Sequence, residues 1–214
     1  MHTLNIIIHV LAGILAMISG LLAITVVKGG TKHRQAGNFF LKAISIVIIT
    51  GLFGVIIYQR NTFLLIITLL SGYNAFSGFR VLKLRDRKPL FFDYVVPVMV
   101  LAAGAYYLYY IKSIGLYWSP VIIYSTLSAL VIVTLYDLCK VFVSVNKLAK
   151  TATYEHIYKM TSALTGITSA FLGTVLPQFH PYSQILPSVI SLIYIIIKFI
   201  TYRFKQRSQN FHSV

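Results

Sequence analysis

The chain has 214 residues, of which 57% are hydrophobic and only 11% are charged. In soluble domains about a quarter of the residues are charged. A soluble globular fold is therefore excluded, and most of the chain is expected to lie in lipid. The net charge of +15 does not indicate a nucleic-acid partner. Its basic residues stand in short clusters between long apolar runs, which is the pattern of membrane topology signals.

The first apolar segment, residues 4–27, contains no charged residue. As a helix it would be about 36 Å long, more than the roughly 30 Å of bilayer hydrocarbon, so it is predicted to span a membrane. One face of this helix combines a histidine with small residues that let another helix lie close. This face consists of His9, Gly13, Ala16 and Gly20. Gly29 and Gly30 are predicted to end the helix.

Further apolar segments follow at residues 38–58, 62–82, 93–111, 118–138, 156–176 and 185–204. Short connections between them predict an all-α, polytopic membrane protein: one bundle of seven transmembrane helices over residues 1–204, then a short polar tail over 205–214. The longest connection precedes residue 156 and has room for a short interfacial helix.

Small residues predict where the helices touch. The sixth segment carries a seam of them at four-residue spacing, namely Ser162, Gly166, Ala170 and Thr174. Lipid gives helices no hydrophobic reason to associate, so Gly13, Gly20 and Gly166 are expected at close helix contacts. Ile195, in the last segment, is expected to face lipid.

The basic residues also predict the orientation. Nearly all of them lie on one side of the membrane: in the first, third and fifth connections, in the adjoining helix ends and at the C-terminal end. They are Lys28, Lys32, Arg34, Lys42, Arg80, Lys83, Arg85, Arg87, Lys88, Lys140, Lys147, Lys150, Lys159, Lys198, Arg203, Lys205 and Arg207. Only Arg60 and Lys112 fall on the other side. By the positive-inside rule the N-terminus is outside and the C-terminus is cytoplasmic.

All the acidic residues are predicted at the cytoplasmic ends of helices, together with two histidines, His33 and His156. These acids are Asp86, Asp93, Asp137 and Glu155. One interpretation is a metal site with His33 and His156 as ligands, completed by Asp137, Asp93 or Glu155, because imidazole and carboxylate suit zinc, iron or manganese. Another is that the two histidines are axial ligands of a b-type haem.

In the alternative interpretation these residues bind neither a metal nor haem. Acids near many Lys and Arg residues balance charge, Glu155 and Lys159 form an ordinary i,i+4 pair, and the histidines lie among lipid headgroups. A shared site requires the helices that carry His33 and His156 to meet, with the two nitrogens about 4 Å apart or less. Imidazoles separated by more than about 10 Å could not share one metal ion.

His9 is expected about two turns below the outer surface, on a side without carboxylates. An ionised imidazole would be poorly solvated there, so the neutral form is expected. Ionisable residues inside the membrane are candidates for function, and His9 is therefore a candidate for binding a cofactor. The structural alternative is a neutral imidazole that is hydrogen-bonded to Ser, Thr, Tyr or a backbone carbonyl of a neighbouring helix.

Several short motifs occur in one order along the chain. They are H-x3-G-x6-G from His9, KGGxxHRxxG from Lys28, SGxR from Ser77, and HxxxMxS from His156. In this order they resemble an uncharacterised bacterial family of predicted multi-pass membrane proteins, a domain of unknown function. This resemblance implies a bacterial inner membrane and assigns no reaction. The HRxxG turn is also similar to a turn in the membrane domains of ferric reductases and b-type cytochromes, and this weaker likeness keeps haem among the candidate cofactors.

The function that the sequence favours is therefore an inner-membrane protein that binds a metal or haem through His9, His33 and His156, in redox or assembly work. Two other classes stay open. One is a membrane-embedded metal-dependent hydrolase, with His33, His156 and Asp137 around a divalent ion such as zinc that activates water. The other is a cofactor-free structural protein that binds a membrane-protein partner or a second copy of itself.

Overall fold

The computed structural model describes residues 2–58, 63–84, 87–114 and 119–211. Within these ranges the chain is all-α and contains no strand. Its elements are α1 (His2–Thr25), α2 (Thr31–Tyr58), α3 (Phe63–Lys83), α4 (Phe91–Ile114), α5 (Pro120–Cys139), η1 (Lys140–Phe142), α6 (Val145–Val175), η2 (Pro177–Phe179) and α7 (Tyr182–Phe211). Three residues used above for the orientation and the acidic group, Arg60, Arg85 and Asp86, lie outside the described residues.

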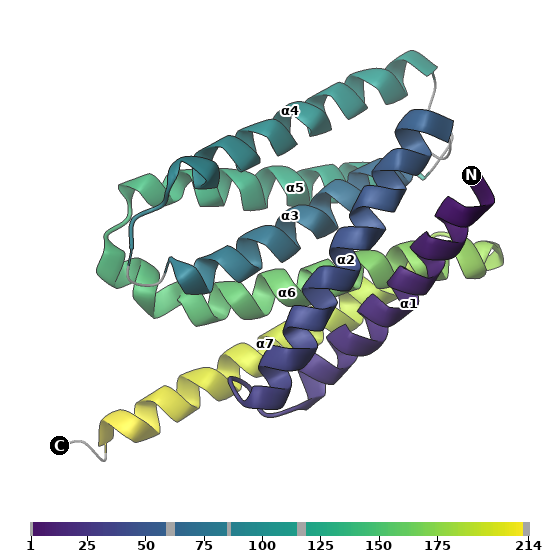
Figure 1. Cartoon of the computed structure of the whole chain (residues 1–214). Helices are drawn as coiled ribbons and strands as arrows, with labels where there is room; N and C mark the ends of the chain where they lie inside the picture. The colour runs from purple at the N-terminus through teal and green to yellow at the C-terminus, as the bar shows by residue number, and fades with distance from the viewer. Residues whose placement is uncertain (1, 59–62, 85–86, 115–118, 212–214) are drawn as a thin grey trace.

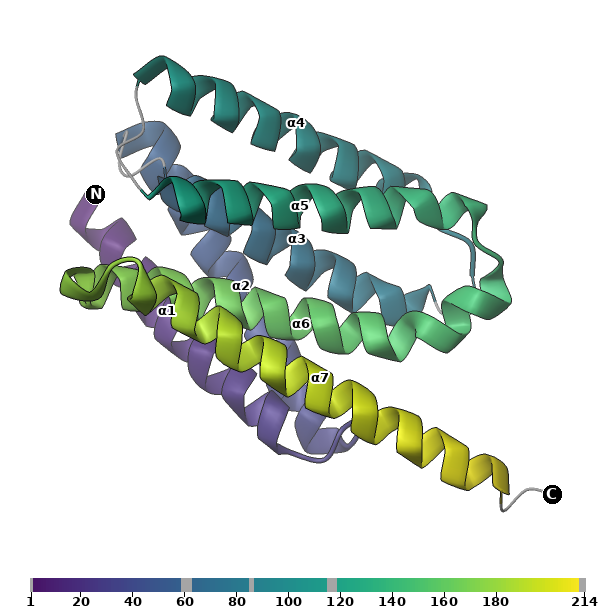
Figure 2. The ribbon, with the colours of Figure 1, turned by 180° about the vertical axis from the view of Figure 1, so that it is seen from behind.

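The helices form one bundle in which α6 is central. It packs between α3 and α7 and also contacts α1. The antiparallel pair α4 and α5 lies against α3, and the hairpin of α1 and α2 lies on the other side (Figures 1 and 2). The two termini lie at opposite ends of the bundle. The C-terminal part of α7 extends beyond the other helices in both views.

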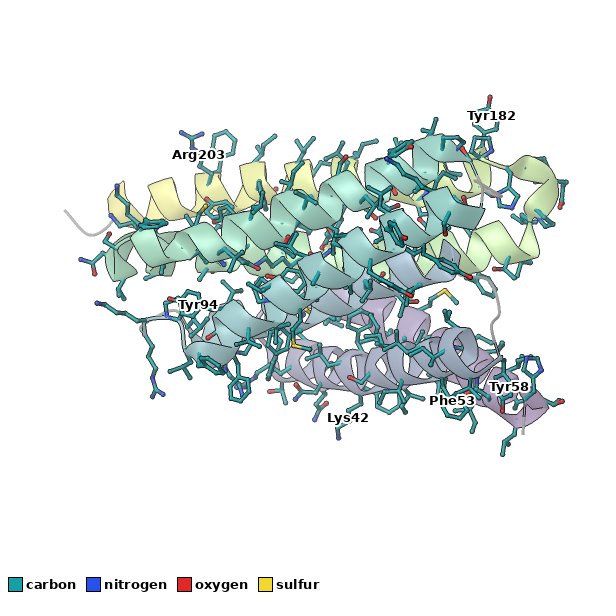
Figure 3. All side chains as sticks on the ribbon, turned by 90° about the horizontal axis from the view of Figure 1, so that it is seen from above. Lys42, Phe53, Tyr58, Tyr94, Tyr182 and Arg203 are labelled. Atoms are coloured by element: carbon teal, nitrogen blue, oxygen red, sulfur yellow. The ribbon has the colours of Figure 1, made fainter. Side chains whose placement is uncertain are left out.

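Six of the described helices are long and apolar enough to cross a membrane, namely α1 to α5 and α7. Many large apolar side chains are exposed on their outer faces, as lipid-facing surfaces require. Figure 3 shows Phe53 of α2 pointing away from the bundle. The chain is thus an all-α protein with the features of a multi-pass membrane protein. The helix α6 is not among these six, and it packs against α1, α3 and α7.

The interior contains two apolar clusters. One joins α3, α4 and α5 around Tyr107, Ile123 and Leu130, and the other joins α1, α2, α3 and α6 around Phe40 and Ala163. Each of these side chains is no more than 2% exposed. The helix α3 belongs to both clusters, so it fixes the position of α6 relative to the pair α4 and α5.

The glycine predictions are partly confirmed. Gly29 has φ +78°, which an L side chain rarely adopts, and it lies in the turn between α1 and α2. Gly20 is a close contact, because a Cβ there would lie 2.7 Å from Leu164 Cδ1. A Cβ on Gly166 would overlap with Ser71 Oγ of α3. The prediction for Gly13 is wrong, since nothing would lie within 4 Å of its Cβ.

Three other expectations change. The expectation of a long connection before residue 156 is wrong, because α6 already begins at Val145, shortly after the turn η1. Ile195 is 6% exposed and is therefore buried rather than lipid-facing. Residues 205–211, expected as a polar tail, continue α7 to Phe211.

Candidate functional site

His33 lies in the first turn of α2 and contacts the end of α1. Its Nδ1 is 2.9 Å from the carbonyl oxygen of Ala23. The last carbonyl groups of a helix have no partner within the helix. A backbone carbonyl can only accept a hydrogen bond, so Nδ1 carries the proton and donates it. The imidazole is held in one tautomer by the end of α1.

His156 lies in α6 and reaches α3. Its Nδ1 donates to the carbonyl oxygen of Gly78, at 2.8 Å. Gly78 permits this contact because the two helices are very close at this point. A Cβ on Gly78 would lie 2.9 Å from Lys159 Cβ and 3.2 Å from Met160 Sδ. The glycine of the SGxR motif is therefore explained by helix packing, and the packing positions His156.

The two imidazoles lie next to each other. Their ring centroids are 6.3 Å apart and the rings are inclined at 78°. In both rings Nδ1 is used by a backbone carbonyl, which leaves Nε2 as the atom with a lone pair. Hydrogen bonds of this kind fix and orient histidines that bind metals.

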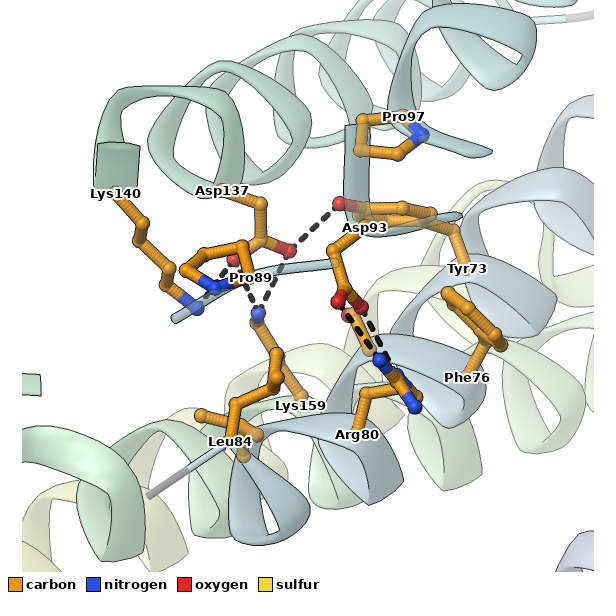
Figure 4. Close-up of a pocket in the computed structure, with 12 residues that line it drawn as sticks. Tyr73, Phe76, Arg80, Leu84, Pro89, Asp93, Pro97, Asp137, Lys140 and Lys159 are labelled. Carbon is orange, nitrogen blue, oxygen red and sulfur yellow. Dashed lines mark hydrogen bonds and ion pairs between the residues drawn. The ribbon is translucent and has the colours of Figure 1, made fainter. Parts of the chain in front are cut away.

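Asp137, the third expected ligand, lies in a different group of side chains (Figure 4). Its carboxylate accepts hydrogen bonds from Lys159 Nζ at 2.6 and 2.7 Å and from Tyr73 at 2.6 Å. Lys140 Nζ lies 2.6 Å from the same carboxylate. Ammonium groups at this distance hold a buried carboxylate firmly, because the charges attract strongly away from water. The donors of α3, α6 and η1 therefore occupy the carboxylate oxygens.

Glu155 belongs to the same group. It forms an ion pair with Lys140 and accepts a hydrogen bond from the Tyr136 hydroxyl at 2.9 Å. The expected i,i+4 pair with Lys159 is present at 3.8 Å. Burial alone would lower the pKa of Lys140, but the carboxylates of Asp137 and Glu155 outweigh it and raise that pKa. We call Asp137, Lys140, Glu155 and Lys159 the buried ion cluster.

A small cavity adjoins the buried ion cluster. It has a volume of about 30 Å³, room for one or two water molecules. Its polar lining includes Tyr73, Ser77 and the pair of Arg80 with Asp93. The guanidinium of Arg80 holds the Asp93 carboxylate through two hydrogen bonds, at 2.9 and 2.7 Å. The positive and negative groups of the lining therefore largely neutralise one another.

His9 is separate from both groups. Its Nδ1 is 2.9 Å from the Thr50 hydroxyl of α2, and that hydroxyl donates to the Ile46 carbonyl at 2.7 Å. The imidazole thus donates and Thr50 accepts. His9 lies 14 residues before Ala23, the partner of His33, which is about 21 Å along α1. The structure gives His9 the hydrogen-bonded partner of the structural alternative and does not bring it to the histidine pair.

Of the expected site residues, the structure places His33 beside His156 and brings Asp137 and Glu155 together in the buried ion cluster, away from the imidazoles. The described parts of the chain contain no group of three or more His, Cys, Asp or Glu side chains arranged to hold a metal ion. Sequence reasoning missed Lys159 as the partner of Asp137. A signal was available: Lys159 is a charge inside an apolar segment, and such a charge is almost always paired.

Comparison with known proteins assigns the chain to no family. No protein-family model matches it, and no match was found among curated proteins or solved structures. The resemblance to an uncharacterised bacterial membrane family and the likeness to ferric-reductase domains therefore stay predictions, and the function is argued from the site alone.

Proposed function

We propose that the protein crosses a bacterial inner membrane seven times, with its N-terminus outside. The six apolar helices support this, and so does the central position of α6, whose neighbours on several sides are protein. Termini at opposite ends of the bundle agree with an odd number of crossings. The distribution of Lys and Arg supports the orientation.

The proposed topology predicts the behaviour of C-terminal fusions. A reporter that is active only in the cytoplasm should be active when fused after residue 214, and one that is active only in the periplasm should be silent. A fusion after Ser113, before the fifth segment, should give the opposite pair of results. If the C-terminal fusion is active in the periplasm, the orientation or the number of crossings is wrong.

We further propose that His33 and His156 bind one metal centre, and that this centre is haem iron. The observation that supports it is the pair itself: two imidazoles with centroids 6.3 Å apart, each held by a carbonyl in the tautomer that presents Nε2. Metal binding requires the neutral imidazole with a lone pair. The pair joins α1, α2, α3 and α6, so the site depends on the assembled bundle.

The number of ligands favours haem over zinc. A structural zinc site takes four protein ligands and a catalytic one takes three, whereas haem iron needs one or two axial side chains. Two imidazoles meet here, and the carboxylate of Asp137 is held by lysines instead. A hydrolase that uses Asp137 would first have to break these ion pairs. A haem held by two histidines would supply one-electron transfer, which agrees with a redox role.

The haem proposal predicts an absorption spectrum. Protein purified in detergent from cells supplied with haem should show a Soret band and carry one haem per chain. His33→Ala and His156→Ala should each shift the band and lower the amount of haem bound per chain, because either change removes one of the two axial ligands. His9→Ala is the matched control, since its imidazole is bonded to Thr50 of α2, and it should keep the band.

Each of the other outcomes points to one alternative. Zinc in a one-to-one ratio without a Soret band would replace the proposal with a metal-dependent hydrolase. If a well-folded, monodisperse preparation contains neither haem nor metal, the remaining alternative is the cofactor-free structural protein. Loss of the band in His9→Ala, with both other variants unchanged, would move the site to the opposite end of α1.

A further inference from the structure

Two lysines lie close to the ring of Tyr194, near the histidine pair. Lys28 Nζ lies 6.0 Å from the ring centroid of Tyr194, and Lys198 Nζ lies 5.3 Å from it. Lys28 follows α1, whereas Tyr194 and Lys198 lie one turn apart on α7. Two segments that are distant in sequence thus place like charges close together. Cations favour the face of an aromatic ring, but this does not neutralise them.

Lys28 is held in place by the end of α1. Its ammonium donates to the carbonyl oxygens of Ala23 at 2.9 Å and Ile24 at 2.7 Å, where the helix dipole also favours a positive charge. Although much of the side chain is exposed, the ammonium lies against protein. Its desolvation, followed by the charge of Lys198, lowers the pKa of Lys28 to about 8. The repulsion between the two lysines would be relieved by an anion between them.

No described carboxylate can serve as that anion, because each has other partners. Asp93 is bound by Arg80, and Asp137 and Glu155 belong to the buried ion cluster with Lys140 and Lys159. The side chains near Lys28 are instead the imidazoles of His33, which shares the carbonyl oxygen of Ala23 with it, and of His156. The neighbourhood has positive and neutral groups, with no negative group among the described side chains.

We propose that Lys28, Tyr194 and Lys198 form a binding site for the phosphate group of an anionic phospholipid. The site lies where α1 leaves the predicted membrane span, and basic residues at that level attract anionic headgroups. Apolar side chains adjoin both lysines: Val27 is 84% exposed and Ile197 is 55% exposed. They offer a surface for the acyl chains, which free phosphate would not use. The site is separate from the iron ligands proposed above.

The test uses the full-length protein, stripped of lipid in a zwitterionic detergent and titrated with phosphatidylglycerol. Bound lipid is counted by native mass spectrometry. The Lys28→Ala/Lys198→Ala double variant should bind one lipid fewer, or bind it at least about tenfold more weakly, because each surface lysine contributes about a factor of five. Lys28→Arg/Lys198→Arg keeps both charges and should retain most of the binding.

The control is Lys42→Ala/Lys83→Ala, which removes two exposed lysines elsewhere and leaves the same net charge. Figure 3 shows Lys42 pointing away from the bundle. If both double variants lose binding equally, only the overall charge matters and the proposed site is wrong. If phosphatidylcholine binds as well as phosphatidylglycerol, the anionic headgroup is not recognised. If inorganic phosphate displaces the lipid at equal concentration, the ligand is the free anion and the lipid assignment fails.

Discussion

Lys159→Met is expected to lower the free energy of unfolding by about 3–5 kcal/mol, the usual cost of removing one partner from a buried ion pair. Lys159 is 2% exposed, and its ammonium lies 2.6 Å from the Asp137 carboxylate. Without it the two buried carboxylates share only Lys140. The charge of the cluster would change from balanced to negative in surroundings that solvate charge poorly.

The loss can be measured by titrating SDS into detergent micelles and following helix content. Lys42→Met removes a lysine from the exposed surface and should change the free energy by no more than about 0.5 kcal/mol. Adding Asp137→Asn to Lys159→Met should recover part of the loss, because the remaining Glu155 and Lys140 then balance. If Lys159→Met unfolds at the same SDS concentration as Lys42→Met, the buried ion cluster contributes nothing to stability.

Gly166→Leu is expected to destabilise the bundle at least as strongly as the upper end of the range for overpacked cores, about 3 kcal/mol. Even the first added carbon would overlap with Ser71 Oγ, so α3 and α6 would have to separate. These two helices join the apolar clusters and position His156 against Gly78. The variant should therefore also weaken whatever binds to the histidine pair.

Gly13→Leu is the matched control, because the same side chain would there enter open space. Gly166→Ala should destabilise the bundle less than Gly166→Leu does. Adding Ser71→Ala to Gly166→Ala should relieve much of the remaining destabilisation, because it removes the oxygen that overlaps with the new Cβ. The same SDS titration measures all four variants. Equal destabilisation by Gly13→Leu and Gly166→Leu would contradict the close contact between α3 and α6.

Much of the helical framework could be predicted from the sequence, because apolar length and turn residues are local signals. The turn at Gly29 and Gly30 and the close contact at Gly20 are examples. The start of α6 at Val145 does not follow from the apolar pattern, since its first turns are polar. Gly13 and Ile195 were misjudged for one reason: helical spacing shows that residues share a face but not what the face contacts.

The candidate site, like the fold, could be predicted from the sequence only in part. His33 and His156 were considered together because both were expected at one side of the membrane, and the bundle does bring their rings to 6.3 Å. The place of Asp137 could not be foreseen in this way. Its partners Tyr73 and Lys159 are 64 and 22 residues away, and only the packing of α3, α5 and α6 selects them. In this bundle the carboxylate of Asp137 is paired with Lys140 and Lys159 instead.

The polar composition of α6 bears on how the chain is synthesised. A helix that carries Lys159 and Glu155 gains little from entering lipid alone, since an unpaired charge in lipid costs free energy, up to about 2.5–3.5 kcal/mol for a lysine at the helix centre. Its partners Asp137 and Lys140 precede it in the chain and would already be at the membrane when it emerges from the ribosome. On the seven-span topology, we expect α6 to wait at the translocon until α7 follows, so that the two enter the bilayer as a hairpin and the ion pairs close as they enter.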